Sequence, residues 1–419
     1  PDFLSRLEME EEYIEEMAKK NAEIPKVRKM SYEKVHELYQ LIQTISHMLE
    51  YANHFTTLDR NITVEQFAAK TFGELGSQKK LKTYSDDAPA RKFVQKMLRE
   101  GMLDSPTFFN LIGGDGGSGD ILYASLRNGL DKKTVAVNES MKFMERTMNE
   151  LKITGSDIQK WAQNARPIRV KSTDINVPYV TDAQLMELYV LNKREQARKH
   201  IYGNKDNLEM TKVNGGIQFD KTSGPKGLQM NKTKAFRHLT EQDVENLTDL
   251  LSPQQKQLAE RMQRFLATSV SSWGNETSMN LYGYEKFLEP SYWPIRSASE
   301  YRATKTSDIE RGMTTLANMG FTKATVQKAQ NPIVIGNIFD TFTNHIDKMS
   351  SYNAFLPALE DLQKWLNYQD GYQSMKAEIT DTLSDNALEF LNNLILDLNG
   401  SRGRADGWGA FTTILMGKA

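Results

Sequence analysis

Residues 333–369 read IVIGNIFDTFTNHIDKMSSYNAFLPALEDLQKWLNYQ, and this stretch decides the fold class. From residue 338 onward, apolar side chains recur at intervals of four and three, a spacing that places them on one face of a helix. They are Ile338, Phe342, Ile346 and Met349, continued by Leu356, Leu359 and Leu362. Pro357 has no amide hydrogen, so we expect it to bend this helix or break it locally. The stretch predicts a long helix in a mainly α protein.

Helix-start signals recur along the rest of the chain. In a capping box, a Ser or Thr hydroxyl accepts a hydrogen bond from the amide three residues later, and the Glu or Gln there reaches back. The boxes are Thr63…Gln66, Ser156…Gln159, Thr181…Gln184, Ser252…Gln255 and Ser307…Glu310. Ser252-Pro253 and Asn331-Pro332 add Pro at the first helical position. The longest helices are therefore expected at residues 32–58, 120–150, 254–282 and 333–369.

Two segments interrupt this helical pattern. Residues 111–120 read LIGGDGGSGD, and residues 202–236 contain three separate groups of turn residues. Within the second segment, residues 212–219 read KVNGGIQF, and Asn-Gly accepts the positive φ of a tight turn. We therefore predict a small β-hairpin or extended insertion near 202–236, together with a short extended piece from Ile175 to Val180.

The interruptions suggest four parts of an irregular multi-helix protein. We expect an N-terminal helical unit at residues 1–110 and a central helical unit at 120–200. A basic loop or hairpin insertion follows at 201–238. The C-terminal helical unit, with an aromatic-rich loop, occupies 239–419.

Composition excludes several classes of protein. The 419 residues carry a formal net charge of −1 and include no Cys, which excludes a disulfide scaffold, a thiolate metal site and a Cys nucleophile. No stretch approaches the roughly 18 apolar residues that a membrane span needs. The chain begins at Pro1 and ends in an apolar run at Leu415–Ala419, so we expect it to be a piece of a longer protein.

Motifs for catalysis are missing from the sequence. No G-x-S-x-G, H-E-x-x-H, EF-hand or kinase pattern occurs. The Gly-rich run at 113–119 lacks the Lys-Ser/Thr ending of a P-loop, and we favour a connector over a phosphate site. His36, His47 and His54 share a helix face but lie too far apart along it for one metal ion. His345 is interpreted as a packed, hydrogen-bonded side chain. We therefore predict no catalytic residue, no cofactor and no metal.

Charge is distributed unevenly along the chain. Between residues 193 and 237 there are 11 basic and 4 acidic residues, whereas residues 1–24 are acidic. This basic stretch could contact a nucleic-acid backbone, the acidic N-terminal segment or a partner chain. The candidate contact residues are Lys193, Arg194, Arg198, Lys199, Lys226, Lys232, Lys234 and Arg237.

Aromatic residues gather between positions 273 and 301. The structural aromatic cluster predicted here consists of Trp273, Tyr282, Tyr284, Tyr292 and Trp293. Such side chains bury large areas and usually need a partner for their N–H or O–H group. We expect an aromatic-pinned loop that closes the C-terminal core, with a stacking or interface surface as the alternative.

The same region resembles a known family. The runs WGNE at 273–276, LYGY at 281–284 and YWPI at 292–295 are similar to large polyvalent proteins, the giant multidomain proteins of phages and integrative or conjugative elements. NMGFTK at 318–323, NP at 331–332, NIFD at 337–340, HIDKM at 345–349, YNA at 352–354 and WLNY at 365–368 continue the similarity. It covers roughly residues 181–370, with looser likeness at 101–110 and 185–196.

The resemblance implies a module of such a protein. These giants are thought to enter the recipient cell with the element's DNA, which implies a location in the virion or in the bacterial host cytoplasm. The implied function is a non-catalytic structural or interaction module, whose partners are other parts of the parent polypeptide or virion proteins. The alternative is a nucleic-acid-associated accessory module that uses residues 193–237. An enzyme ranks third and would need His345, Asp347 or Glu276 to converge in a pocket.

Overall fold

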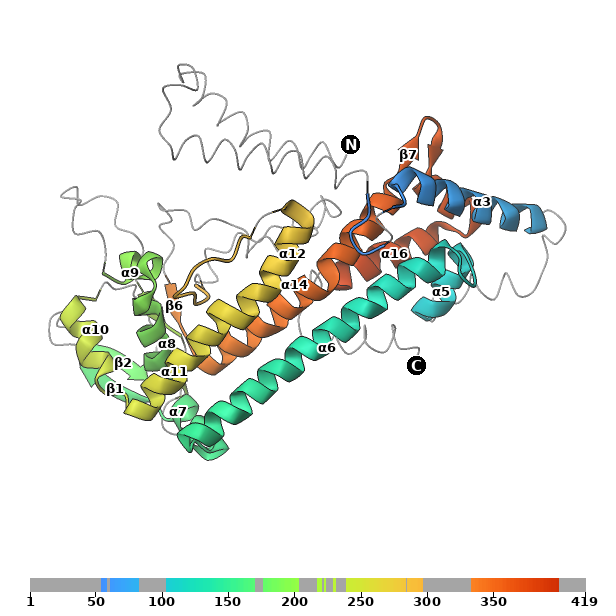
Figure 1. Cartoon of the computed structure of the whole chain (residues 1–419). Helices are drawn as coiled ribbons and strands as arrows, with labels where there is room; N and C mark the ends of the chain where they lie inside the picture. Colours follow the sequence, from blue (N-terminus) through green and yellow to red (C-terminus); the bar gives the residue numbers. More distant parts are fainter. Residues whose placement is uncertain are drawn as a thin grey trace, which may run out of the picture.

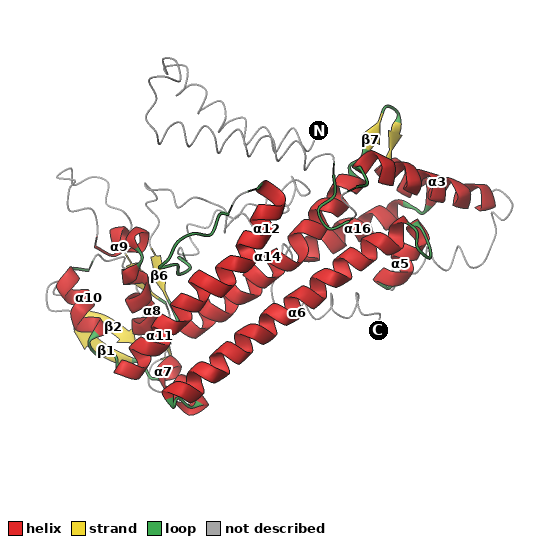
Figure 2. Cartoon of the chain, in the orientation of Figure 1, coloured by secondary structure: helices red, strands yellow, loops and turns green. Residues whose placement is uncertain are grey.

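The computed structural model confirms the mainly α fold (Figure 2). It describes residues 54–58, 61–82, 103–169, 176–202, 217–220, 222–223, 229–230, 239–283, 285–296 and 333–398. The predicted acidic N-terminal helix, most of the predicted helix at 32–58 and the Ser307…Glu310 box lie outside these residues. Residues 54–58 are not helical. None of the helices described there is long and apolar enough to cross a bilayer.

The N-terminal half of the described chain is built mostly of helices. They are α3 (Val64–Lys82), α5 (Ser105–Ile112), α6 (Ser118–Leu151), α7 (Gly155–Gln163), α8 (Asp182–Lys193) and α9 (Glu195–Tyr202). The short strands β1 (Arg166–Arg169) and β2 (Asn176–Val180) pair antiparallel between α7 and α8. Strand β2 confirms the extended piece predicted at residues 175–180.

The C-terminal half continues the pattern. Its helices are α10 (Glu241–Thr248), α11 (Pro253–Phe265), the π-helix η3 (Leu266–Val270), α12 (Ser271–Tyr282), α14 (Ile338–Leu366), α15 (Met375–Thr382) and α16 (Asp385–Leu398). Its strands are β3 (Ile217–Phe219), β4 (Thr222–Ser223), β5 (Gln229–Met230), β6 (Ile333–Ile335), β7 (Gln369–Asp370) and β8 (Gln373–Ser374).

Three long helical rods run side by side along the molecule (Figure 1). One is α6, the second is α14, and the third is α11, η3 and α12 in series. Helices α6 and α14 are in close contact at Gly129. A Cβ atom there would lie 2.6 Å from the carbonyl oxygen of Ala354 and 3.0 Å from the ring of Phe355. Gly129 therefore permits the close contact of the two longest helices.

Two hydrophobic cores lie at the two ends of these rods. The first core joins α3, α5, α15 and α16 to the start of α6 and the second half of α14, around Trp365 and Phe355. The second core joins α8 to α11 and β6 to the end of α6 and the first half of α14, around Trp293 and Leu185. Each core therefore takes residues from both sides of the predicted unit boundaries. The four-part division of the chain stays a prediction.

Helix α14 differs from the prediction at both ends and at Pro357. Residues 333–335 form strand β6, and the helix begins only after Asn337, whose side chain accepts a hydrogen bond from the amide of Phe339 at 3.0 Å. The helix start predicted at Asn331-Pro332 is therefore wrong. The helix is also one element through Pro357, so the predicted local break does not occur. The side chain of Pro357 is buried among the packed helices, where tertiary contacts outweigh the lost hydrogen bond.

Three of the predicted capping boxes form at the predicted residues, and one forms two residues earlier than predicted. Thr63, Thr181 and Ser252 form the predicted boxes. The box predicted at Ser156…Gln159 is wrong, because Thr154 and Asp157 form it two residues earlier. Thr240 and Asp243 form a further box. In both unexpected boxes the residue that reaches back is Asp, whereas the usual capping box has Glu or Gln at that position.

The predicted insertion near 202–236 contains short strands with different partners from those expected. Residues 217–219 pair in parallel with β6, with Ile217 opposite Ile333 and Phe219 opposite Ile335. The other arm of the predicted 212–219 hairpin lies outside the described residues. A small antiparallel pair follows, with Thr222 opposite Met230. The β3–β6 pairing joins segments more than 100 residues apart, which local turn signals cannot reveal.

Candidate functional site: a groove along α11 and α12

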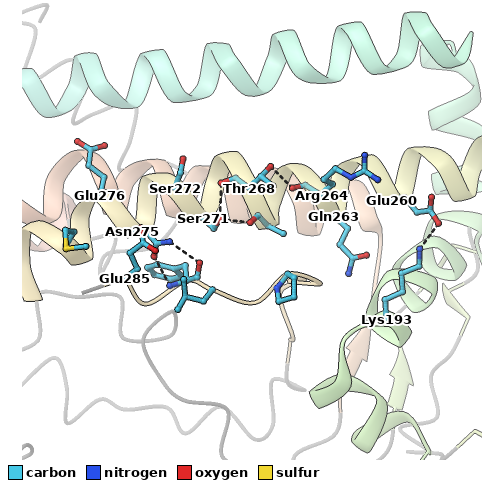
Figure 3. A pocket seen from close by; sticks show the side chains of 15 residues that line it. Lys193, Glu260, Gln263, Arg264, Thr268, Ser271, Ser272, Asn275, Glu276 and Glu285 are labelled. Atoms are coloured by element: carbon cyan, nitrogen blue, oxygen red, sulfur yellow. Dashed lines mark hydrogen bonds and ion pairs between the residues drawn. The ribbon is translucent and has the colours of Figure 1, made fainter. Parts of the chain in front are cut away.

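An open groove runs along the rod formed by α11, η3 and α12 (Figure 3). It has a volume of about 900 Å³. One wall is the helical rod, and the floor is the segment 285–290, which returns alongside it. The sequence contained no motif for this groove, since its lining comes from ordinary polar helix positions and from a loop.

Side-chain amides fix the floor to the helix. Asn275 donates to the carbonyl oxygen of Phe287 at 3.1 Å and accepts from the amide of Phe287 at 2.8 Å. Gln263 donates to the carbonyl oxygens of Val190 and Ser291. Gly274 lets the ring of Phe287 pack against the helix, because a Cβ there would lie 2.7 Å from that ring. The groove is therefore preformed by contacts within the chain.

Hydroxyl groups occupy the middle of the wall. Thr268 donates to the carbonyl oxygen of Arg264 at 2.8 Å, Ser271 to that of Ala267 at 2.7 Å and Ser272 to that of Ser269 at 2.7 Å. Each hydroxyl hydrogen is thus used inside the helix, and the oxygen keeps lone pairs that can accept. These residues lie in or next to the π-helical turn, a deviation frequent at functional sites.

The two ends of the groove carry different charges (Figure 3). At one end Lys193 donates to Glu260 at 2.6 Å, and Tyr189 donates to the same carboxylate. The hydrogen bond from Lys193 lowers the pKa of Glu260. Arg264 lies exposed beside this pair. The other end holds Glu276 and Glu285.

The acidic end also has an apolar rim. Glu276 forms an exposed ion pair with Lys132 of α6 at 3.0 Å. Met279 is 46% exposed and Leu288 is 68% exposed, and both line the groove. No ion pair joins Glu285 or Arg264 to another residue that the structure describes. Two charges of opposite sign are thus available at opposite ends of the groove.

A buried carboxylate organises the second core. Glu187 of α8 is 1% exposed and accepts hydrogen bonds from Thr341 at 2.6 Å, Trp293 at 3.3 Å and the amide of Gly336. Arg296 also contacts it at 3.3 Å. No motif in the sequence pointed to Glu187, although a lone acid in the apolar run Leu185–Leu191 is a signal for such a buried carboxylate.

The predicted aromatic cluster is divided among several surroundings. Trp293 is fully buried in the second core, while Trp273 and Tyr292 pack partly buried against it. Trp273 meets the ring of Phe265 edge to face. Tyr282 ends α12, and Tyr284 lies outside the described residues. Tyr292 and Trp293 of the loop, and Trp273 of α12, thus pack in or against the second core, while the five-residue cluster stays a prediction.

His345 is buried, as the sequence indicated. It is 4% exposed and its ring lies 5.1 Å from that of Tyr292. Burial, with the nearby cations Lys348 and Arg194, lowers the pKa of His345 to about 3. Burial also raises the pKa of Tyr292 to about 12. Both groups are therefore held neutral at ordinary pH.

The residues that an enzyme would need to bring together, His345, Asp347 and Glu276, each have a different partner. Asp347 accepts a hydrogen bond from Lys133 at 2.6 Å, whereas Glu276 pairs with Lys132. His345 faces Tyr292 instead. His36 and His47 lie outside the described residues. Within the described part of the chain, no group of three or more metal-ligating side chains is found.

The Gly-rich run is a compact helix–helix turn between α5 and α6. The amide of Ser118, at the start of α6, donates to the carboxylate of Glu74 at 3.0 Å. A Cβ on Gly119 would collide with the carbonyl oxygen of Phe109. The helix N-terminus that attracts phosphate in other proteins is thus occupied by a carboxylate of α3. Packing explains Gly113, Gly117 and Gly119, and a φ of 70° explains Gly116.

Three described residues of the basic stretch contact other parts of the chain. Lys193 pairs with Glu260, and Arg198 lies 3.6 Å from Glu241. Arg194 is 8% exposed and donates to the carbonyl oxygen of Trp293 at 2.5 Å. Lys199 belongs to α9. The remaining candidates lie outside the described residues: Lys226, Lys232, Lys234 and Arg237.

Comparisons with known proteins found no relative of this chain. The chain matches no protein-family model, no curated protein and no solved structure. The resemblance to large polyvalent proteins rests on the quoted residues alone and stays a prediction.

Proposed function

We propose that this chain is a non-catalytic interaction module whose binding site is the groove along α11 and α12. The observation that supports this most directly is the chemistry of the lining. Its ionisable groups are exposed or in ion pairs, and its amides are used to hold the floor in place. The strongly shifted pKa values belong to His345 and Tyr292, which do not line the groove. Acid–base catalysis is favoured by groups whose pKa lies near the operating pH, whereas in the groove the pKa of Glu260 is lowered and that of Lys193 is raised, both away from neutral pH.

A photo-crosslinking experiment tests this function. Benzoylphenylalanine would replace Ser272 in the groove and, as the matched control, exposed Lys142 on α6. In cells that naturally carry the gene, we expect one discrete protein adduct from position 272 and none from position 142. Equal labelling from both positions would contradict an interaction site in the groove.

We further propose that the module belongs to a large polyvalent protein delivered with phage or mobile-element DNA. The resemblance across residues 181–370 supports this setting. The partners would then be other parts of the parent polypeptide or virion proteins, in the virion or in the bacterial cytoplasm. Quantitative mass spectrometry of full and emptied particles tests the delivery. Peptides from 181–370 should be present in full particles and lost on emptying, and absence from full particles would overturn it.

The nucleic-acid alternative receives less support from the described residues. Lys193, Arg194 and Arg198 each have an internal partner. The groove itself is lined by three carboxylates and two cations, a poor match for a polyphosphate backbone. We therefore place the interaction module first.

A further inference from the structure

The two ends of the groove carry opposite charges, and this difference identifies a class of partner. One end presents Arg264 beside the Lys193–Glu260 pair, and the other presents Glu276 and Glu285 (Figure 3). A ligand with only negative groups would be repelled at the acidic end, and a ligand with only positive groups would be repelled at the Arg264 end. The complementary ligand carries a negative group and a positive group at opposite ends.

The length of the groove fits an extended peptide. Arg264 and Glu276 are 12 positions apart along a helical rod, which corresponds to about 18 Å at about 1.5 Å per residue. An extended chain advances about 3.3 Å per residue, so about five or six residues span that length. The volume of about 900 Å³ accommodates a segment of this kind.

The middle of the groove matches a peptide backbone. The hydroxyls of Thr268, Ser271 and Ser272 donate within their own helix, so they offer acceptor oxygens to a ligand. Backbone N–H groups of an extended segment supply the donors. The exposed side chains of Met279 and Leu288 offer an apolar contact next to the acidic end.

We propose that the groove binds an extended segment of a partner polypeptide with an acidic side chain at Arg264 and a basic side chain at Glu276 and Glu285. An apolar residue of the partner lies beside the basic one, against Met279 and Leu288. This inference rests on the proposed function, because it specifies the partner of the same groove.

A displayed library of random ten-residue peptides tests the inference. The probe is the library itself, selected against the full chain. We expect enriched peptides to carry an acidic and a basic residue four to six positions apart, with an apolar residue next to the basic one. Enrichment without this charge pattern, or no enrichment, would overturn the proposed ligand class.

Charge-reversal variants of the chain then test whether an enriched peptide binds in the groove. Arg264→Glu should weaken an enriched peptide by about fivefold, as expected for loss and reversal of an exposed ion pair. Exchange of the acidic residue of the peptide for Lys should restore affinity to that variant. Glu285→Lys should likewise weaken the peptide, and exchange of the basic residue of the peptide for Glu should restore affinity to that variant. The matched controls Arg146→Glu and Glu139→Lys change exposed charges on α6 and should leave affinity unchanged. Equal binding to all four variants would overturn the inference.

The crosslinking experiment separates the two proposals. A discrete adduct at position 272 with failure of the peptide selection would leave the groove an interaction site and remove the charged extended peptide as its ligand. Failure of both would remove the interaction function as well.

Discussion

At the scale of single residues, Glu187 connects several separate segments of the second core. Its carboxylate joins α8 to Trp293, to Arg296, to the turn at Gly336 and to Thr341 of α14. The approach is so close that a Cβ on Gly336 would collide with the guanidinium of Arg296. A buried charge is tolerated only when its oxygens are satisfied, and here several donors converge on it.

Removal of this carboxylate should destabilise the fold strongly. Glu187→Ala leaves the buried donors of Trp293, Thr341 and Gly336 without their acceptor. We expect the free energy of unfolding, measured by urea titration, to fall by about 3–5 kcal/mol. The control Glu139→Ala removes an exposed acid of α6 and should change it by less than about 0.5 kcal/mol. A similar small change for both variants would contradict the role of Glu187.

His345 should make stability depend on pH. Its pKa is about 3 in the folded chain, below the ordinary 6.5, mainly because the ring is buried. The unfolded chain therefore takes up this proton first as the pH falls. The contribution is fully present above about pH 6.5 and is lost progressively as the pH falls toward 3. From pH 7 to pH 5, His345 alone should lower the free energy of unfolding by about 2 kcal/mol.

The measurement compares two pH values in two proteins. Urea titrations of the natural chain and of His345→Gln at pH 7 and pH 5 give the pH-dependent loss for each. The loss should be about 2 kcal/mol smaller in the variant, whatever its absolute stability. An identical loss in both proteins would show that His345 titrates normally.

At the scale of elements, the turn between α5 and α6 shows how packing uses glycine. Three positions in this turn leave no room for a side chain: Gly113, Gly117 and Gly119. Glu74 of α3 completes the turn through the amide of Ser118. The run of glycines thus brings α5 back against α6 and fixes the start of the longest helix.

Alanine should distinguish a packed glycine from an open one. Gly119→Ala forces a methyl group against the carbonyl oxygen of Phe109, and we expect a loss of about 1–3 kcal/mol in the free energy of unfolding. Gly155→Ala is the matched control, because it lies at the start of α7 with open space around its Cα. It should be neutral or stabilising by up to about 1 kcal/mol. Equal effects of the two changes would mean that the turn is not tightly packed.

Elements also show which local signals are reliable. Thr181 and Ser252 start helices as their boxes predicted, because capping is decided within four residues. The continuous helix predicted at 254–282 contains instead a π-turn at residues 266–270. The start of α14 was misplaced because Ile333–Ile335 pairs with a distant strand. Local sequence describes a cap well and a long-range pairing poorly.

At the scale of the whole molecule, two helices connect the two cores. Helix α14 contributes Trp365 and Phe355 to the first core and Phe342 and Ile346 to the second. Helix α6 likewise has Leu126 in the first core and its last turns in the second. Neither core can lose its part of these helices without disturbing the other.

The two cores should therefore unfold together. Two single-tryptophan variants, with either Trp293 or Trp365 retained and the other tryptophans replaced by Phe, report on one core each. Within each variant, the fluorescence transition in urea should coincide in midpoint and slope with the transition followed by circular dichroism, which reports on helices of both cores. A fluorescence midpoint that differs from the circular-dichroism midpoint of the same variant would show that the connecting helices do not couple the cores.

The sequence by itself determined the helical class, the helix starts at Thr63, Thr181 and Ser252, and the apolar spacing from Ile338 to Met349, because hydrogen bonds and side-chain spacing within a few residues decide them. It also indicated the buried His345. Only the tertiary structure decided the groove, whose wall and floor meet through Asn275 and Phe287. It likewise decided the surroundings of Glu187, which joins positions up to 154 residues apart. Contacts between distant segments depend on how whole helices pack, and no local pattern of residues encodes that.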